Sequence, residues 1–479
     1  MKASPRLPRS VIARRRRRRA GFTLVELTVS LLAGLLVAIA IVGLSKEATR
    51  SFHEEVRASA AEASLRTAID RLRADLARAS YMSTANIFAD PRIAHVLGGP
   101  NVAANTAATY PGIGKLQGVR LYEGSPAQNS ALGLTLSSWN GAIAPDKIEI
   151  AGNMTGSEQF EIQGITPLAA GGTCTTILLS TQPAAYRVLN NNNATNEAGV
   201  NTPTAAADTE MANLFHPSSD LARQFIVRIV DNAGCTQYLP TCKGVQTAGL
   251  VLNGAFQPYV LVTGAPIMAT DAGTVCGVQG NAAGQGFVNP VQVVRWEILG
   301  PAPTGADQEP QQDVTALGNQ FTGVAEAGAG DPNKYDLTRM YLDAAGNVVP
   351  DTEEVVAEYA VDLDFAFTVD TSVDTTGGTP TLTTYDFDSN GDTHNQLAAD
   401  DATTGTKPQR IRSIRVRLVT RAAQADRSVN IPLTDGGVPY IYRYCLQPGG
   451  CNSTTALQWA RARTVTTEVA LRNQARYFY

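Results

Sequence analysis

The sequence predicts an α+β protein in which a long N-terminal helix, transmembrane in its first half and amphipathic in its second, packs on an antiparallel β-sheet with a large β-rich insertion. Three observations predict this fold class. An apolar run covers Phe22 to Leu44, and helical spacing of apolar residues continues from Ser45 to Ser80 without Pro or Gly. Short strand-like segments separated by Gly- and Asn-rich loops fill the rest of the chain.

The composition agrees with this fold class. The chain has 479 residues, with 42 Gly, 25 Pro and only 17% charged residues, a balance that excludes coiled-coil, collagen-like and highly charged disordered proteins. Its formal net charge is −4, but nine positive charges and no acid lie in the first 21 residues. The other 458 residues hold 30 basic against 43 acidic side chains, a formal charge of −13.

The apolar run from Phe22 to Leu44 has 23 residues and one charge. As a helix it extends ~34 Å, enough to cross a membrane. A secretory signal peptide fits less well, because the residues after Leu44 offer no small-x-small cleavage site. A plain membrane anchor leaves Glu26 unexplained, since a carboxylate in the hydrocarbon costs roughly 2.5 to 3.5 kcal/mol and usually has a functional partner.

The residues before and around that carboxylate carry a specific resemblance. The run Gly21-Phe22-Thr23-Leu24-Val25-Glu26 follows a basic leader and opens an apolar helix, and it resembles the class III signal of type IV pilins and type II secretion pseudopilins. The resemblance implies that a prepilin peptidase cuts between Gly21 and Phe22, and that Phe22 is then N-methylated. It also implies that Glu26 neutralises the terminal amine of its own or a neighbouring subunit and sets the register during assembly.

Charge asymmetry sets the expected topology. The basic leader precedes the apolar run, so the leader stays in the cytoplasm and the residues after Leu44 are exported. We therefore expect a removed leader at residues 1–21, the transmembrane half of a pilin helix at 22–44 and its amphipathic half at 45–80. The apolar stripe expected to pack on a sheet consists of Phe52, Val56, Ala60, Ala63, Leu65, Ile69, Leu72, Leu76 and Ala79.

From Tyr81 onward the patterns indicate strands. The predicted strands cover residues 119–122, 147–150, 176–179, 225–230, 259–262, 291–299, 339–342, 361–369, 411–419, 440–444 and 464–471. In the strand from Ile411, alternation places Ile414, Val416 and Leu418 on one face and Ile411, Arg415 and Arg417 on the other.

The C-terminal third is similar to large minor pilins of the PilW type and, more distantly, to J-type pseudopilins. The similarity rests on short pieces in order: Val293–Glu297, Leu337–Leu342, Val356–Glu358 leading into Val361–Phe367, Ile411–Leu418 and Leu471–Asn473. It implies that residues 291–479 form a pilin-type β-sheet region. Residues 81–290 exceed what such a sheet needs, so we expect them to form the β-rich insertion.

One loop resembles a calcium site. Asp386, Asp388, Asn390 and Asp392 alternate along a loop that has Gly391 at its sixth position, the arrangement of oxygen ligands that calcium favours. The bidentate glutamate of an EF-hand is absent, because Leu397 occupies the twelfth position. Calcium is therefore an optional ligand, and the competing interpretation is a solvated acidic turn.

Six cysteines in an exported chain predict disulfides. They allow many connectivities, of which spacing favours the two local pairs Cys235–Cys242 and Cys445–Cys451, with Cys174–Cys276 as the third. A metal site is a weak alternative, since the chain has no C-x-x-C pair and only four His.

The sequence offers no enzyme site. Gly112-Ile113-Gly114 resembles part of a phosphate-binding loop without the strand and helix that such a loop needs, and no nucleophile and base stand in a recognisable pattern. The arginines between Arg410 and Arg421 fall on both strand faces of an acidic chain, so nucleic acid is not an expected partner.

The resemblance as a whole implies a minor type IV pilin that supports adhesion or motility. It would lie in the bacterial inner membrane as a single-pass protein with a periplasmic C-terminal region, then enter the cell-surface pilus at low copy, as part of a tip priming complex. The implied partners are the prepilin peptidase, other minor pilins, the major pilin and a tip adhesin. Two alternatives stay open: a J-type pseudopilin of type II secretion, and a surface adhesin anchored by a class III signal.

Overall fold

The computed structural model describes residues 23–93, 110–122, 143, 145–156, 159–166, 174–180, 214–215, 223–242, 250–252, 255–257, 259–264, 286–299, 334–350, 352–372, 381–387, 408–425, 443–446, 451 and 458–474. Its described residues form an α+β protein whose bulk is antiparallel β-sheet. The chain divides into two compact units, Met1–Ser59 and Ala60–Tyr479.

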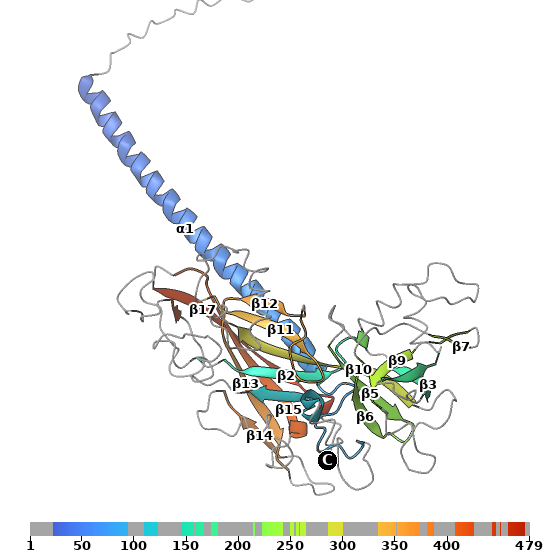
Figure 1. Ribbon diagram of the computed structural model, residues 1–479. Coiled ribbons are helices and arrows are strands. Elements are labelled where there is room, and N and C mark those ends of the chain that lie inside the picture. Colours follow the sequence, from blue (N-terminus) through green and yellow to red (C-terminus); the bar gives the residue numbers. More distant parts are fainter. Residues whose placement is uncertain are drawn as a thin grey trace, which may run out of the picture. The chain divides into compact units, whose positions relative to one another are not determined.

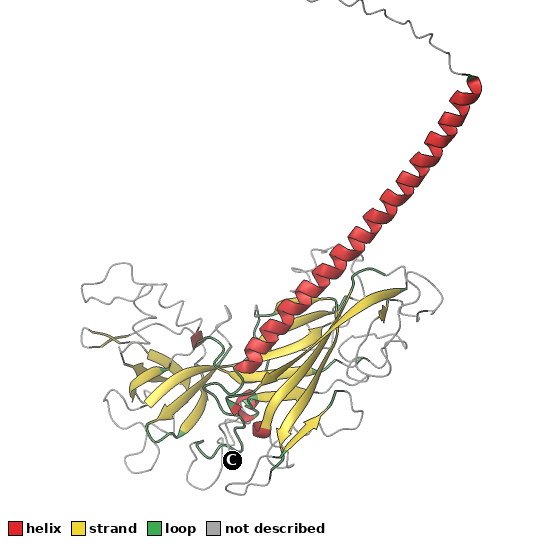
Figure 2. Cartoon of the chain, turned by 180° about the vertical axis from the view of Figure 1, so that it is seen from behind, coloured by secondary structure: helices red, strands yellow, loops and turns green. Residues whose placement is uncertain are grey.

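One long helix, α1, covers Leu24–Ala77 (Figures 1 and 2). Within the first unit its large apolar side chains from Leu24 to Leu44 are exposed, and Phe52 is 64% exposed. Within the second unit the predicted stripe is buried from Leu65 onward, because Leu72 and Leu76 pack into the same core as the strands. From Leu65 onward, the apolar side of the helix therefore faces the core.

Five strands of a ten-stranded sheet form the part, here called the first sheet, against which this second part of α1 packs. They lie in the order β1 (Val119–Tyr122), β2 (Lys147–Gly152), β10 (Gly286–Leu299), β11 (Asp336–Leu342) and β12 (Glu354–Glu358), all antiparallel. Alternate residues of β10, Val294, Trp296 and Ile298, enter the core with α1. Their neighbours Val293, Arg295 and Glu297 therefore lie on the opposite face.

A second sheet of five strands shares that core. Its order is β14 (Leu382–Tyr385), β13 (Ala360–Asp370), β15 (Ile411–Arg421), β17 (Trp459–Ala470) and β16 (Arg443–Cys445), and a short 3₁₀ helix, η2 (Pro408–Arg410), precedes β15. The predicted inward face of β15 is confirmed for Ile414, Val416 and Leu418. Ile411 is buried with them, contrary to simple alternation, because the β13–β15 register shifts beside it.

Further strands surround a second hydrophobic core. β3 (Phe160–Thr166), β4 (Cys174–Leu179), β5 (Ile226–Asp231), β6 (Thr236–Pro240) and β9 (Tyr259–Thr263) contribute to it, together with Val288 at the start of β10. The pair β7 (Leu250–Leu252) and β8 (Ala255–Gln257) forms a separate ribbon, and one helical turn, α3 (Pro111–Gly114), precedes β1.

The strand β10 connects the two cores, as its central place in Figure 1 suggests. Its first residues pair with β5 and β3, and Gln292–Leu299 pair with β2 and β11. The expected boundary between residues 290 and 291 therefore falls inside one continuous strand. The expected insertion at 81–290 also contains β1 and β2, which pack with α1 in the first core.

Two of the strands that the sequence did not predict, β3 and β6, have features that explain why. β3 contains Gly164 beside a register shift in its pairing with β4, which weakens the alternation. β6 ends at Pro240, and all of its residues are buried, including the polar Thr236 and Gln237, so it lacks the alternation of buried apolar and exposed polar residues that marks a half-exposed strand.

The disulfides differ in part from the expected pairing. Cys445 is joined to Cys451, as predicted, but Cys174 is joined to Cys242. The expected pairs Cys235–Cys242 and Cys174–Cys276 are therefore wrong. The physical reason is that β4 pairs with β9, and the backbone N–H of Cys242 donates to Leu261 on β9, which brings two cysteines 68 positions apart to a Cα separation of 5.8 Å. Cys235 is disulfide-bonded, and Cys276 lies outside the described residues.

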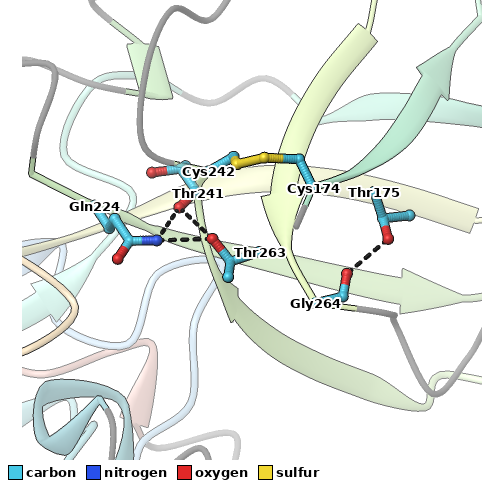
Figure 3. Close-up of a disulfide and its surroundings, with 7 residues drawn as sticks. All are labelled: Cys174, Thr175, Gln224, Thr241, Cys242, Thr263 and Gly264. Carbon is cyan, nitrogen blue, oxygen red and sulfur yellow. Dashed lines mark hydrogen bonds between the residues drawn. A yellow bond between two sulfur atoms is a disulfide. The ribbon is translucent and has the colours of Figure 1, made fainter. Parts of the chain in front are cut away.

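Hydrogen bonds hold the strands beside this disulfide in place (Figure 3). The Gln224 amide donates to the Thr241 carbonyl and to the Thr263 hydroxyl, each at 2.7 Å. On the other side, the Thr175 hydroxyl donates to the carbonyl of Gly264 at 2.6 Å. The positions of both cysteines are thus fixed by contacts between strands rather than by sequence proximity.

Peptide mapping tests the pairing directly. Digestion of the oxidised protein without reductant should release a peptide that links Cys174 to Cys242, identified by mass spectrometry and lost on reduction. The link between Cys445 and Cys451 serves as the internal control. A peptide that links Cys235 to Cys242 would contradict the observed strand arrangement.

Candidate functional site

The start of α1 is closed by a reciprocal pair of hydrogen bonds. The Glu26 backbone N–H donates to the Thr23 hydroxyl at 3.3 Å, and the backbone N–H of Thr23 donates to the Glu26 carboxylate at 3.1 Å. The Thr23 hydroxyl also donates to that carboxylate at 3.1 Å. This is a capping box, which satisfies donors that the first helical turn leaves free.

The segment that follows is apolar and exposed in the described structure. Leu24–Lys46 has 23 residues with a mean hydropathy of 2.6, none of them buried. Leu24 is 79% exposed and Leu44 is 73% exposed. Length, composition and exposure make this segment compatible with a single-pass membrane anchor. Gly21 and Phe22, the predicted cleavage and methylation residues, lie outside the described residues.

The other end of α1 is fixed by one buried carboxylate. Asp75 accepts a hydrogen bond from Trp296 Nε1 at 3.0 Å and forms an ion pair with Arg339 Nε at 2.8 Å. These partners come from the neighbouring strands β10 and β11. Arg339 also donates to the Tyr341 hydroxyl at 3.2 Å and lies 4.8 Å from the centre of its ring. The Asp75 carboxylate helps to raise the pKa of the Arg339 guanidinium above its ordinary value, against the opposing effect of burial.

Three weaker contacts support this attachment. Arg71 forms an ion pair with Glu354 at the start of β12, where both side chains are about two-fifths exposed. Arg78, just after the helix, donates to the carbonyl of Met154, and Asn473 donates to the Ala77 carbonyl at 3.0 Å. Residues from three distant parts of the chain thus contact the last turns of α1.

The expected calcium loop is only partly described. Asp388, Asn390 and Asp392 lie outside the described residues. Asp386 follows β14, is 77% exposed and forms an ion pair with Arg415 at 2.9 Å. Among the residues that the structure describes, no group of three or more His, Cys, Asp or Glu side chains is arranged to hold a metal ion.

Several arginines near and within β15 have carboxylate partners inside the fold. Arg417 pairs with Asp364 at 2.6 Å and with Asp362 at 3.2 Å, and Arg412 pairs with Asp370 at 3.3 Å. Ser372 and Arg412 together hold the pKa of the Asp370 carboxyl below its usual value. These ion pairs therefore join side chains of β15 to side chains of the neighbouring strand β13.

Comparison with known proteins returned no relative. No protein-family model matches the chain, and neither a curated protein nor a solved structure does. Any function inferred for this site must therefore be argued from the residues of the chain itself.

Two of these arrangements were absent from the sequence prediction. The capping box has a readable signature, Thr23-x-x-Glu26 before an apolar run. Asp75 has no such signature, because its partners lie more than 200 positions away. Helical spacing placed the residue on α1 and gave no indication of what it contacts.

Replacing the buried carboxylate should loosen this attachment. Asp75→Asn leaves the Arg339 charge buried without its carboxylate, so we expect the free energy of unfolding to fall by roughly 3 to 5 kcal/mol. Asp70→Asn is the matched control, because Asp70 is on the same helix, 75% exposed and 3.6 Å from Arg73. It should change stability by less than about 1 kcal/mol. Urea denaturation of the full chain in detergent measures both, and equal midpoints would contradict the role assigned to Asp75.

Proposed function

We propose that this chain is a minor type IV pilin similar to the PilW type. The observation that carries the proposal is the arrangement at the start of α1. A capped first turn containing Thr23 and Glu26 directly follows the Gly21-Phe22 junction, and it opens an exposed apolar segment. A processed N-terminus at the head of a membrane-crossing helix is the part that pilin-like subunits have in common.

The packing of the later helix supports the same proposal. In the second unit α1 packs on antiparallel strands through Leu65, Leu72 and Leu76, with Asp75 as its polar contact. Packing a helix of this kind on a sheet is also what the resemblance to pilins implies. The second core, around β3, β4, β5, β6 and β9, is additional to the helix and sheet that this resemblance implies.

The proposed location and partners follow from this. The precursor lies in the bacterial inner membrane with its C-terminal region in the periplasm, where the disulfides form. It then joins other minor pilins, the major pilin and a tip adhesin at low copy. The second core makes the subunit bulky, which favours the tip over routine positions along a filament. Calcium at Asp386 and the residues after it belongs to this proposal as an optional ligand.

Two other functions would use the same helix. A J-type pseudopilin would serve type II secretion, and its exported region would be smaller than this one. A surface adhesin would use the class III signal only as an anchor and would not enter filaments. Recovery of the chain from sheared filaments distinguishes the pilin from the adhesin. Loss of protein secretion with intact pili in a deletion strain would favour the pseudopilin.

Processing of the leader is the first test. Mass spectrometry of sheared surface filaments should find this chain beginning with N-methyl-Phe22. Gly21→Leu should leave the leader attached and remove the chain from the filaments, because the peptidase requires a small residue at that position. Gly34→Leu, within the apolar segment, is the control for a change of the same kind. Normal cleavage in Gly21→Leu would refute the proposal.

Glu26 has two candidate roles that substitutions can separate. Glu26→Gln keeps a side chain that closes the capping box but removes the charge. Thr23→Val removes the capping hydroxyl and keeps the charge. If Glu26 neutralises a terminal amine, Glu26→Gln should be processed normally yet lost from filaments at least about tenfold, while Thr23→Val assembles. The reverse pattern would assign Glu26 to helix capping alone.

A further inference from the structure

A charged cleft lies on the face of the first sheet that points away from α1. It has a volume of about 190 Å³ and is formed by β1, β2 and β10 on one side and by the turn after β11 on the other. Lys115, Arg120 and Arg295 line it together with Glu149 and Asp343. Arg120 and Tyr122 of β1 lie on this side because their neighbours Val119 and Leu121 enter the core on the other.

The wall opposite the sheet is made largely of backbone. Gly346 has a φ of +90°, within a turn in which its N–H donates to the carbonyl of Asp343 at 2.9 Å. Gly112 packs so closely on this turn that a Cβ would lie 2.7 Å from the carbonyl oxygen of Ala344. The glycine-rich run around residue 112, which resembled a phosphate loop, thus has a packing role that fixes the shape of the cleft.

The two carboxylates of the cleft already have partners within the chain. Glu149 accepts from Arg295 Nη2 at 2.8 Å and from the Tyr122 hydroxyl at 3.0 Å. Asp343 lies 3.6 Å from Arg223 and accepts from the backbone N–H of Ala345 at 2.9 Å. Burial and the Glu149 charge raise the pKa of Tyr122, so its hydroxyl stays protonated and remains a donor.

The remaining cations have no such partner. The guanidinium of Arg120 lies 4.8 Å from the centre of the Tyr122 ring but makes no ion pair with a described residue, and its Nε is buried without a hydrogen bond there. Lys115 is exposed at the lip and forms no ion pair within the described chain. The cleft therefore carries surplus positive charge next to carboxylate oxygens that have further acceptor capacity.

This combination selects one class of ligand. An arginine and a lysine that line the same cleft favour a carboxylate or a phosphate as its ligand. Glu149 and Asp343 disfavour a doubly charged phosphate but accept hydrogen bonds from hydroxyl groups. The volume is below the range of about 300 to 1,000 Å³ typical of drug-sized ligands, which limits the occupant to roughly one sugar ring.

We propose that this cleft binds a singly charged, hydroxylated carboxylic acid of monosaccharide size, such as a hexuronate, with its carboxylate at Arg120 and Lys115 and its hydroxyls toward Glu149 and Asp343. The inference does not depend on the proposed pilus function, since all of these residues lie within the second unit. It would give the protein a means of contacting acidic polysaccharide.

Calorimetry or ligand-observed NMR on the full chain in detergent tests this, with glucuronate and galacturonate as probes. At least one should bind at millimolar concentration. Glucose lacks the carboxylate and acetate lacks the hydroxyl groups, so each should bind at least about tenfold more weakly. Inorganic phosphate should not compete at the same concentration. Failure of both uronates to bind, or equal binding of glucose, would overturn the proposal.

Variants connect the binding to the cleft. Arg120→Met should weaken uronate binding by about tenfold or more, since a hydrogen bond to a charged group is lost. Arg463→Met, an exposed arginine on β17, is the matched control and should bind normally. If Arg120→Met fails to fold, Lys115→Gln at the exposed lip gives a second test and should weaken binding several-fold. Unchanged binding in the folded cleft variants would place the ligand elsewhere and overturn the proposal.

Discussion

The contact between Asp75 and its partners on β10 and β11 is the interaction on which the second unit depends. A carboxylate on α1 satisfies a tryptophan N–H and an arginine, both buried. Because each partner would be costly to bury alone, the three groups require one another. The apolar residues of α1 provide most of the contacts with the sheet, but apolar contacts are not directional and do not fix the position of the helix along the strands. The polar contact fixes which turn of the helix lies over which strands.

The same strand that holds Asp75 organises the rest of the unit. Trp296 points toward α1, Arg295 beside it lines the cleft on the other face, and Val288 near the start of β10 enters the second core. One strand thus supplies the helix contact, the cleft and the link to the added strands. A shift of β10 by one residue would exchange its two faces and disturb all three.

The two ends of α1 suggest a division of roles. At its start, Thr23 and Glu26 cap a segment whose large apolar side chains, from Leu24 to Leu44, are exposed. Toward its end, Leu65, Leu72 and Leu76 are buried in the core. The first part is therefore compatible with a membrane anchor, and the second attaches the helix to the strands of its unit. The capping box also gives Glu26 a partner inside its own helix, so its charge alone does not demonstrate a contact between subunits.

The sequence by itself determined the features that depend on near neighbours. It located α1 and its change from apolar to amphipathic, the inward face of β15 and the local disulfide Cys445–Cys451, because helical and strand periods and short loops are readable in order. Only the tertiary structure decided the partner of Cys174, the contacts of Asp75, the run of β10 past residue 290 and the cleft around Arg120. Each of these depends on contacts between segments that are far apart in the chain, and such contacts are set by the register and packing of the whole sheet. No local pattern contains that information.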